Sequence, residues 1–284
     1  MATPQTLEMP GYQVVQFLGS GARSTIWQVR DERTNELFAV KRVVVKSHAD
    51  ARFIEQAINE YNIASRLDHP VIRKVYRLRR VRRWLRLREV HILMELCEGR
   101  TVQDERPESV VQAVRIFCDV AAALAYMNAR GFVHADMKPN NIIVAPDGRV
   151  KIIDLGQSCP LGTIKERIQG TPDFMAPEQV HRRPLDGRTD VYNFGAALYW
   201  TLTGRPIPTI MPRKDGMTLM VELAIPAPEQ LNRDVPAPLS KLVIDCVDMQ
   251  PSRRPASMAE VGSRMNLMLH TMNRKPGNGK GPQG

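Results

Sequence analysis

The sequence predicts an α+β fold, with a small, mostly antiparallel β part followed by a larger, mostly helical part. Between Gly11 and about Val45 apolar residues often alternate with polar ones, which is the two-residue period of a strand. Residues 71–96 return to strand character. From Glu108 to Ala129 a long Ala-, Val- and Leu-rich stretch predicts a helix instead, and most of the chain after it is helical.

Three strands and one helix are expected before residue 71. The strands are predicted at 12–18, 26–29 and 37–41. Asp31 to Asn35 supplies a polar turn between the second and third strands. A helix is predicted from about Ala49 to Leu67, where apolar residues recur at helical spacing, and His69-Pro70 ends it.

The second part begins with the helix at 108–129, which Gly131 closes. Further helices are predicted at 190–203, 239–249 and 257–271. The Pro-rich stretch 206–238 is irregular, with a short helix near 217–224. The resulting domain map has an extension at 1–10, a domain at 11–270 and a flexible tail at 271–284. Within the domain, the first part covers about 11–96, a hinge about 95–99 and the second part about 100–270.

Composition sets limits on partners and location. The 284 residues carry a formal net charge of +10, which suits acidic partners, although a merely soluble basic enzyme is the preferred interpretation. The four cysteines show no C-x-x-C spacing, so neither a disulfide framework nor a zinc site is expected. We find no secretory signal and no apolar run of about 18 residues, and we expect a cytoplasmic protein without a membrane-spanning segment.

The densest polar cluster follows the helix at 108–129. Asp136, Lys138 and Asn141 fall within six residues, and Pro139 stiffens the turn. An Asp can accept a hydroxyl proton, a Lys can neutralise a phosphoryl group, and an Asn carbonyl can hold a metal ion. Phosphoryl transfer needs such positioning and charge compensation more than covalent chemistry.

Three other features fit the same chemistry, each with a plainer alternative. Asp154 ends a short strand just before Gly156 and could bind magnesium, but an ordinary turn is equally plausible for it alone. The loop 18–26 contains two glycines that would let a phosphate approach the backbone, and a plain Gly hairpin explains it as well. Lys41 follows apolar residues and needs an acidic partner, for which Glu60 competes with Glu55.

Together these features resemble the eukaryotic-type (Hanks-type) serine/threonine protein kinase family over roughly residues 11–270. The segment His134–Asn141 looks like the family's H-R-D-L-K-P-x-N, Asp154-Leu155-Gly156 like D-F-G, and Phe38–Lys41 like V-A-I-K. Glu60 lies nine residues before the His69-Pro70 pair, as the family's helix Glu does before its H-P.

Three later segments match as well. Gly170–Glu178 resembles the end of an activation segment, and Asp190–Gly195 resembles the buried helix that anchors the catalytic loop. Pro251–Pro255 resembles the late motif whose arginine, here Arg254, pairs with Glu178. The compact length and short loops favour a bacterial-type enzyme.

The resemblance implies a bilobal protein-kinase fold with a nucleotide cleft between the lobes. It also implies transfer of the γ-phosphoryl group of ATP to Ser or Thr hydroxyls of proteins, with Mg2+ as cofactor and Mn2+ as its substitute. Asp136 would be the catalytic base, Lys138 would contact the transferred phosphoryl group, and Thr171 would hydrogen-bond around both. Lys41 and Glu60 would form the catalytic ion pair. Asn141 and Asp154 would ligate the metal. The implied nucleotide-binding residues are Leu18, Gly19, Ser20, Gly21, Ser24, Ile26, Ala39, Lys41, Met94, Glu95, Cys97, Ile143 and Asp154.

Two departures from the family pattern matter. Ala135 replaces the arginine that normally pairs with a phosphorylated activation segment, so we predict that activity does not strictly require phosphorylation there. The residues to test are Ser158, Thr163 and Thr171. Ala64 is smaller than the bulky apolar residue usual one turn after Glu60, which is a minor departure.

The stretch 73–88 is strongly basic. A solvated sheet face, with apolar residues on its other side, is the preferred interpretation. An acidic partner is the sharper alternative, and nucleic acid is disfavoured.

Two other functions compete with an active protein kinase. A pseudokinase acting as a binding module is the alternative, although all four key polar residues, Lys41, Asp136, Asn141 and Asp154, are present. A small-molecule phosphotransferase fits less well, because the Ala-Pro-Glu segment and Arg254 belong to the protein-kinase pattern.

Overall fold

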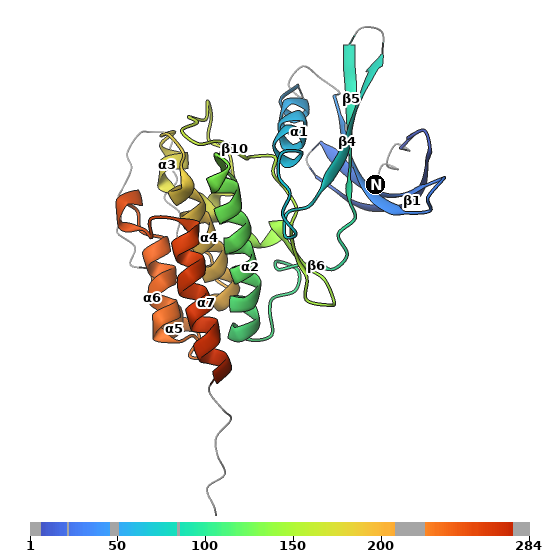
Figure 1. Cartoon of the computed structure of the whole chain (residues 1–284). Coiled ribbons are helices and arrows are strands. Elements are labelled where there is room, and N and C mark those ends of the chain that lie inside the picture. The colour runs from blue at the N-terminus through green and yellow to red at the C-terminus, as the bar shows by residue number, and fades with distance from the viewer. Residues whose placement is uncertain (1–6, 22, 46–50, 84–85, 208–224, 275–284) are drawn as a thin grey trace, which may run out of the picture. The chain divides into compact units, whose positions relative to one another are not determined.

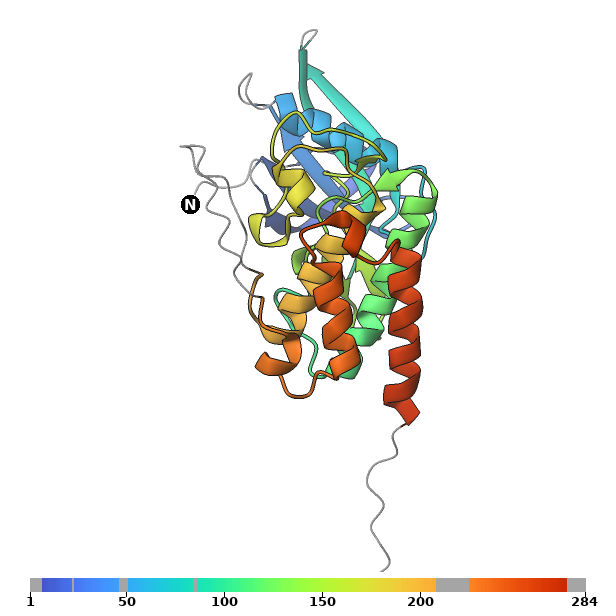
Figure 2. The ribbon, with the colours of Figure 1, turned by 90° about the vertical axis from the view of Figure 1, so that its left-hand side faces the viewer.

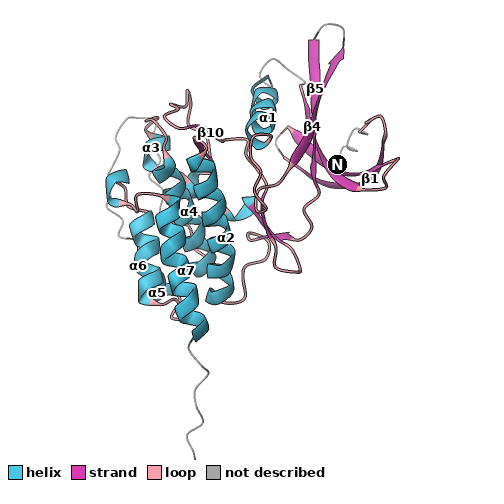
Figure 3. Cartoon of the chain, in the orientation of Figure 1, coloured by secondary structure: helices cyan, strands magenta, loops and turns pink. Residues whose placement is uncertain are grey.

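The computed structural model describes residues 7–21, 23–45, 51–83, 86–207 and 225–274. It divides into two compact units: unit 1 is Met1–Gly99 with Ala145–Ser158, and unit 2 is Arg100–Val144 with Cys159–Gly284. Figure 3 shows that strands dominate unit 1 and helices dominate unit 2, which confirms the predicted α+β class. The predicted short helix at 217–224 and most of the tail at 271–284 lie outside the described residues.

Unit 1 is built on a five-stranded antiparallel sheet in the order β1-β2-β3-β5-β4 (Figure 1). Its strands are β1 (Tyr12–Ser20), β2 (Ser24–Asp31), β3 (Leu37–Val44), β4 (Val75–Arg83) and β5 (Arg86–Glu95). The carboxylate of Asp31 closes the β2–β3 turn by accepting the Arg33 and Thr34 N–H groups at 2.9 and 3.1 Å. The sequence predicted that strand β3 ends at Lys41. β3 instead continues for three more residues, so Lys41 lies within the strand.

The two faces of this sheet are covered differently. Helix α1 (Ala51–Ala64) packs on one face, in a cluster with Val90 and Ile92 of β5. On the other face Leu7 and Met9 join the core. That second cluster consists of Leu7, Met9, Trp27, Val29, Val40 and Leu93. Part of the predicted 1–10 extension therefore belongs to the core of unit 1. The unit also contains β9 (Val150–Ile152), whose Ile152 bridges Ile72 in parallel.

Unit 2 is mainly helical. Its longer helices are α2 (Val110–Ala129), α4 (Gly187–Thr203), α6 (Ala237–Cys246) and α7 (Met258–Arg274), and its short ones are α3 (Pro177–Val180) and α5 (Pro228–Leu231). The short 3-10 helices are η2 (Pro139–Asn141), η3 (Pro172–Phe174) and η4 (Pro251–Arg253). Its strands are β6 (Arg100–Thr101), β7 (Phe132–Val133), β8 (Ile142–Val144) and β10 (Cys159–Pro160). α2 contacts α4 and α7, and α4 contacts α6 (Figure 2).

Capping residues fix the ends of the two central helices. The Ser109 hydroxyl accepts the Gln112 N–H at 3.2 Å before α2, and Gly131 follows that helix with a positive φ of 83°. Asp186 and Thr189 form a capping box at the start of α4. A Cβ on Gly195 would come within 2.5 Å of the Cys246 Cβ, so α4 and α6 can approach this closely only with glycine there.

Among the described helices, α2 is the one long and apolar enough to cross a membrane by length and composition alone. More than half of its apolar window is buried inside the unit, as in a core helix.

Candidate active site

The first group of predicted site residues lies within unit 1. The Lys41 ammonium is 2.6 Å from Glu60 Oε2 and 3.8 Å from Asp154 Oδ1. Glu60 is 2% exposed, and of the two candidate partners, Glu60 and Glu55, it is the one that pairs with Lys41. Burial alone would lower the pKa of Lys41, but the carboxylates of Glu60 and Asp154 outweigh burial and raise it. Lys41 therefore stays charged at neutral pH.

Arg73 belongs to the same cluster, and the sequence did not reveal its role. Its guanidinium donates to the Ile153 carbonyl at 2.8 Å and lies 3.5 Å from Glu60 Oε1. The backbone explains its position, because the Arg73 N–H also donates to the Ile152 carbonyl at 3.0 Å. Each oxygen of the Glu60 carboxylate thus faces a cation. The sequence showed Arg73 only as one of many basic residues.

The second group of predicted residues lies within unit 2. The Lys138 ammonium is 2.9 Å from Asp136 Oδ2 and donates to the Thr171 hydroxyl at 2.7 Å. Asp136 Oδ1 accepts the Thr171 N–H at 3.1 Å. A carboxylate, an ammonium group and a hydroxyl from two separate loops therefore form one compact cluster.

The catalytic-loop candidate, residues 134–141, is held by hydrogen bonds from within itself. Asn141 donates its amide to the Asp136 carbonyl at 2.8 Å. The Asp136 N–H donates to His134 Nδ1 at 3.3 Å. Both His134 and Asn141 are buried, so these bonds are shielded from water. These bonds hold the loop in a shape in which the Asp136 carboxylate contacts Thr171.

Asp190 of α4 anchors the loop 134–141 through its backbone. Its two carboxylate oxygens accept the backbone N–H groups of His134 and Ala135 at 3.0 and 2.9 Å, and the Asn128 amide at 2.8 Å. Asp190 is fully buried. Burial raises the pKa of Asp190 to about 6, although the three N–H donors oppose the shift.

Ala135 adopts a left-handed backbone conformation with φ 60°. This conformation costs a non-glycine residue about 1–2 kcal/mol and persists only where the surroundings enforce it. Here its N–H is held by Asp190, and its carbonyl accepts the Gln179 amide at 2.7 Å. Two buried side chains thus fix one strained residue next to Asp136.

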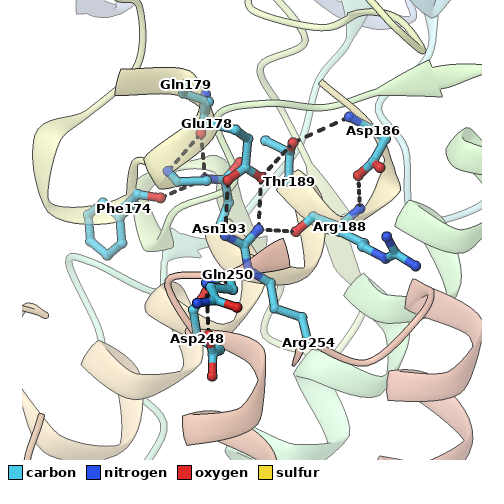
Figure 4. A network of polar contacts seen from close by, with 11 residues as sticks. Phe174, Glu178, Gln179, Asp186, Arg188, Thr189, Asn193, Asp248, Gln250 and Arg254 are labelled. Atoms are coloured by element: carbon cyan, nitrogen blue, oxygen red, sulfur yellow. Dashed lines mark hydrogen bonds and ion pairs between the residues drawn. The ribbon is translucent and has the colours of Figure 1, made fainter. Parts of the chain in front are cut away.

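Gln179 is a second residue that the sequence did not reveal. Besides binding Ala135, its amide oxygen accepts the Ala176 N–H and the Asn193 amide, each at 2.9 Å. Asn193 also donates to the Phe174 carbonyl at 2.6 Å (Figure 4). Gln179 therefore joins the loop 134–141 to the segment before α3 and to α4. A lone Gln after the Ala-Pro-Glu triplet gave no signal of this role.

The predicted pair of Glu178 and Arg254 is present and buried (Figure 4). The guanidinium binds both carboxylate oxygens at 2.8 and 2.9 Å. It also donates to the carbonyls of Asp248 and Arg188, each at 2.8 Å. The Thr189 hydroxyl donates to the same carboxylate at 2.9 Å. The pair is thus fully hydrogen-bonded, which is what a buried ion pair needs to be tolerated.

The side chain of Ala135 lies in apolar surroundings. Ala135 forms a buried cluster with Val133, Cys159 and Leu185. The neighbouring backbone is paired as well: Gly162 donates to the Leu185 carbonyl at 2.7 Å, and Leu185 donates to the Thr163 carbonyl at 3.0 Å. Residues 159–163 are therefore held by backbone hydrogen bonds and by this apolar cluster, with Lys165 interacting with the Cys159 thiol.

The predicted adenine-contacting residues of unit 1 largely share one sheet face. Ile26 pairs with Lys41 across β2 and β3, and Ala39 pairs with Met94 across β3 and β5. Residues 39 and 41 are two apart on β3, so all four side chains leave the same side of the sheet. Leu18 is 43% exposed, Cys97 is partly buried, and Ile143 lies on β8 in unit 2.

The glycine loop closes as a tight turn. Gly21 donates its N–H to the Ser24 carbonyl at 2.8 Å, and a Cβ on Gly21 would come within 2.9 Å of the Ser24 hydroxyl. Gly19 and Ser20 form the end of β1, where Ser20 pairs with Thr25. The predicted residues of this loop thus surround one turn.

Glu95 is held by three contacts. Its carboxylate accepts the Lys74 N–H at 3.0 Å and pairs with the Lys151 ammonium at 2.6 Å. Its own backbone N–H donates to the Lys74 carbonyl at 2.9 Å. The end of β5 is thereby fixed within unit 1.

Comparison with known proteins identifies the family. Residues 12–265 match the family model described as "Protein kinase domain". The chain belongs to the protein kinase domain family. The kinase domain is 30% identical to the serine/threonine-protein kinase PknB of Mycolicibacterium smegmatis over 279 residues, covering 92% of this chain and 43% of the relative. PknB of Mycobacterium leprae is 30% identical over 272 residues, with the same coverage of 92% and 43%.

A probable serine/threonine-protein kinase of Clostridium acetobutylicum is 27% identical over 259 residues, covering 88% of this chain and 38% of the relative. The chain thus spans about two fifths of the length of these relatives. The relatives are bacterial serine/threonine kinases, which confirms the recognised family.

Proposed function

We propose that this kinase domain transfers the γ-phosphoryl group of ATP to serine or threonine hydroxyls of protein substrates. The observation that carries the proposal is the cluster of Asp136, Lys138 and Thr171, in which the carboxylate and the ammonium group are 2.9 Å apart. Asp136 would accept the hydrogen bond of the substrate hydroxyl and take its proton as the bond to phosphorus forms. Lys138 would compensate the negative charge on the transferred group.

Lys41, Asp154 and Asn141 would supply the phosphate and metal contacts. Lys41, kept charged by Glu60, would bind the phosphate oxygens. Asp154 is 39% exposed, and one of its oxygens accepts the Gly156 N–H at 2.9 Å, so the carboxylate is oriented and reachable. Asn141 uses its amide nitrogen on the Asp136 carbonyl, which leaves the oxygen as its ligating atom. Both are hard oxygen donors and suit magnesium, which when bound would neutralise charge on the ATP phosphates.

The apolar face that carries Ile26, Ala39 and Met94 would pack against the adenine ring, with Leu18 as a further predicted contact. The backbone at Glu95 and Cys97 would hydrogen-bond the adenine edge. Ile143 of β8 stays a predicted adenine contact. Cytoplasmic location and the use of Mn2+ stay predictions.

The test is phosphotransfer from Mg-ATP to a generic basic acceptor protein, comparing wild type with Asp136→Asn. Loss of the base is expected to lower kcat by about 100-fold or more. Asp147→Asn is the matched control, because Asp147 is an exposed carboxylate that pairs with Arg149. The control should keep wild-type activity. Equal rates for wild type and Asp136→Asn would instead favour a pseudokinase.

A further inference from the structure

The positive charge of this chain is concentrated in one hairpin. Residues 73–88, here called the basic hairpin, contain nine Lys or Arg residues and no Asp or Glu. The whole chain carries +10, so everything outside the hairpin sums to 10 − 9 = +1. The chain is therefore not a generally basic protein, as its net charge alone had suggested. It is a nearly neutral one with a single basic element.

Most of this charge is solvent-exposed and unpaired. The exposed arginines of the hairpin, whose side chains make no hydrogen bond or ion pair in the described part of the chain, are Arg77, Arg80, Arg82, Arg86 and Arg88. Arg42 of β3 differs: it is 8% exposed and binds both oxygens of Glu89 at 2.7 and 2.8 Å. Arg42 is thus buried and paired, and these five arginines of the hairpin are neither. Arg73 and Arg79 of the hairpin do make contacts, with Glu60 and with the Glu8 carbonyl.

The hairpin is also an edge of the sheet. β4 is the last strand in the order β1-β2-β3-β5-β4, with β5 as its neighbour. In Figures 1 and 2 the β4–β5 hairpin extends beyond the other strands of unit 1. Its outer backbone edge offers N–H and C=O groups for pairing with another strand. Arg80 and Arg82 are two residues apart, so their side chains leave the same face of that edge.

We propose that the outer edge of β4 binds an extended acidic segment of a partner protein by strand addition. The backbone would supply the pairing. Arg80 and Arg82 would select carboxylates at alternate positions on one face of the added strand, and Arg77 would add positive charge on its other face. The same charges would repel a basic strand, including the β4 edge of a second copy of this chain. The inference is independent of phosphotransfer, since it concerns binding alone.

The probe is a fluorescent peptide of about ten residues that alternates Glu and Thr, titrated with the full chain in an anisotropy assay. The affinity should fall at least tenfold between about 50 and about 300 mM NaCl, because exposed charges are screened by salt. Substituting Arg77, Arg80 and Arg82 together by Gln should weaken binding by about tenfold or more.

The matched control replaces Arg66, Arg115 and Arg233 by Gln, three exposed arginines outside the hairpin. This variant loses the same net charge and should bind as wild type does. A loss equal to that of the hairpin variant would overturn the proposal, because general charge would then explain binding.

Two further ligands test the mode of binding. A peptide of the same sequence with N-methylated alternate amides keeps its charge but cannot pair as a strand, so it should bind much more weakly. Equal binding of this peptide would contradict strand addition. Equal or tighter binding of an oligothymidylate of the same length would reassign the surface to nucleic acid. Self-association of the Gln variant, with no peptide binding by wild type, would mean that the arginines only keep strand edges apart.

Discussion

The two units position their polar residues in different ways. In unit 1 the cluster of Lys41, Glu60, Asp154 and Arg73 is assembled by ion pairs between side chains from separate elements. In unit 2 the loop 134–141 is held mainly by hydrogen bonds from buried side chains to its backbone. Side-chain ion pairs break when one element shifts. Backbone groups that are hydrogen-bonded to buried side chains do not move unless the core itself opens.

The comparison teaches where regulation can act. The loop that carries Asp136 is held by Asp190 and Gln179, and the cluster at Ala135 is apolar, so we expect that no phosphate is needed to order the loop. The arrangement around Lys41 depends on charge and on the position of α1. We therefore expect changes in unit 2 to act through stability, and changes in unit 1 to act through nucleotide use.

The largest effect is expected at Arg254. Arg254→Met leaves Glu178 buried without its cation, and breaking a buried pair in this way costs about 3–5 kcal/mol. The free energy of unfolding in urea measures it. Arg253→Met, the exposed neighbour, is the control and should change little. A loss below about 1 kcal/mol for Arg254→Met would show that the pair does not hold unit 2 together.

A smaller, pH-dependent effect is expected at Asp190. Burial raises the pKa of Asp190 to about 6 from an ordinary value of 3.8. A raised carboxyl pKa means that the folded state binds a proton more tightly, so this contribution to stability is complete below pH 3.8 and is lost as the pH rises through about 6.

The free energy of unfolding of wild type minus that of Asp190→Asn should therefore fall as the pH rises from about 4 to about 7, by at most about 3 kcal/mol. Urea titrations at several pH values give this difference. A difference that stays flat, or that increases with pH, would contradict the burial argument for Asp190.

The next effect concerns Arg73. Arg73→Met removes the second cation from Glu60, and kcat/KM for ATP should fall by about tenfold, a change of about 1.4 kcal/mol. In a Glu60→Gln background the same change should cost much less, since the two residues act through one contact. Arg73→Lys should restore part of the loss. Arg77→Met is the exposed control. Additive effects of the Glu60 and Arg73 changes would remove Arg73 from the cluster.

The smallest effect is expected at Thr163. Its hydroxyl donates to the Pro160 carbonyl at 2.7 Å, and its backbone pairs with Leu185. Thr163→Ala should leave kcat within about twofold of wild type, because Ala135 supplies no cation for a phosphate there. Steady-state measurements of kcat test this prediction. A loss of tenfold or more in kcat would show that phosphorylation of Thr163 does control activity. Ser158 is fully buried, which argues against it as an accessible phosphosite.

Much of the site could be predicted from sequence because its residues lie in contiguous motifs. Asp136, Lys138 and Asn141 fall in one loop, and Lys41 and Glu60 have fixed spacing to their neighbours. The choice of Glu60 over Glu55 also followed from spacing, and the 2.6 Å contact with Lys41 agrees with it.

Other contacts could not be predicted, because they join residues distant in sequence through geometry alone. Arg73 reaches Ile153 across 80 positions, and Gln179 reaches Ala135 across 44. Arg73 does not stand out in a chain with 40 Lys and Arg residues, and a single Gln is not a residue type that signals a site. The burial of Leu7 and Met9 was likewise hidden, since a short apolar segment carries no period.

Buried hydrogen bonds, and no phosphate, hold the loop 134–141 in its shape. The most direct test is the phosphotransfer rate of the full chain after phosphatase treatment, with mass spectrometry to verify that residues 159–171 carry no phosphate. The dephosphorylated chain should transfer phosphate from Mg-ATP within about twofold of the untreated rate, and Asp136→Asn should be inactive in both states. A fall of about 100-fold on dephosphorylation, recovered on rephosphorylation, would contradict the account.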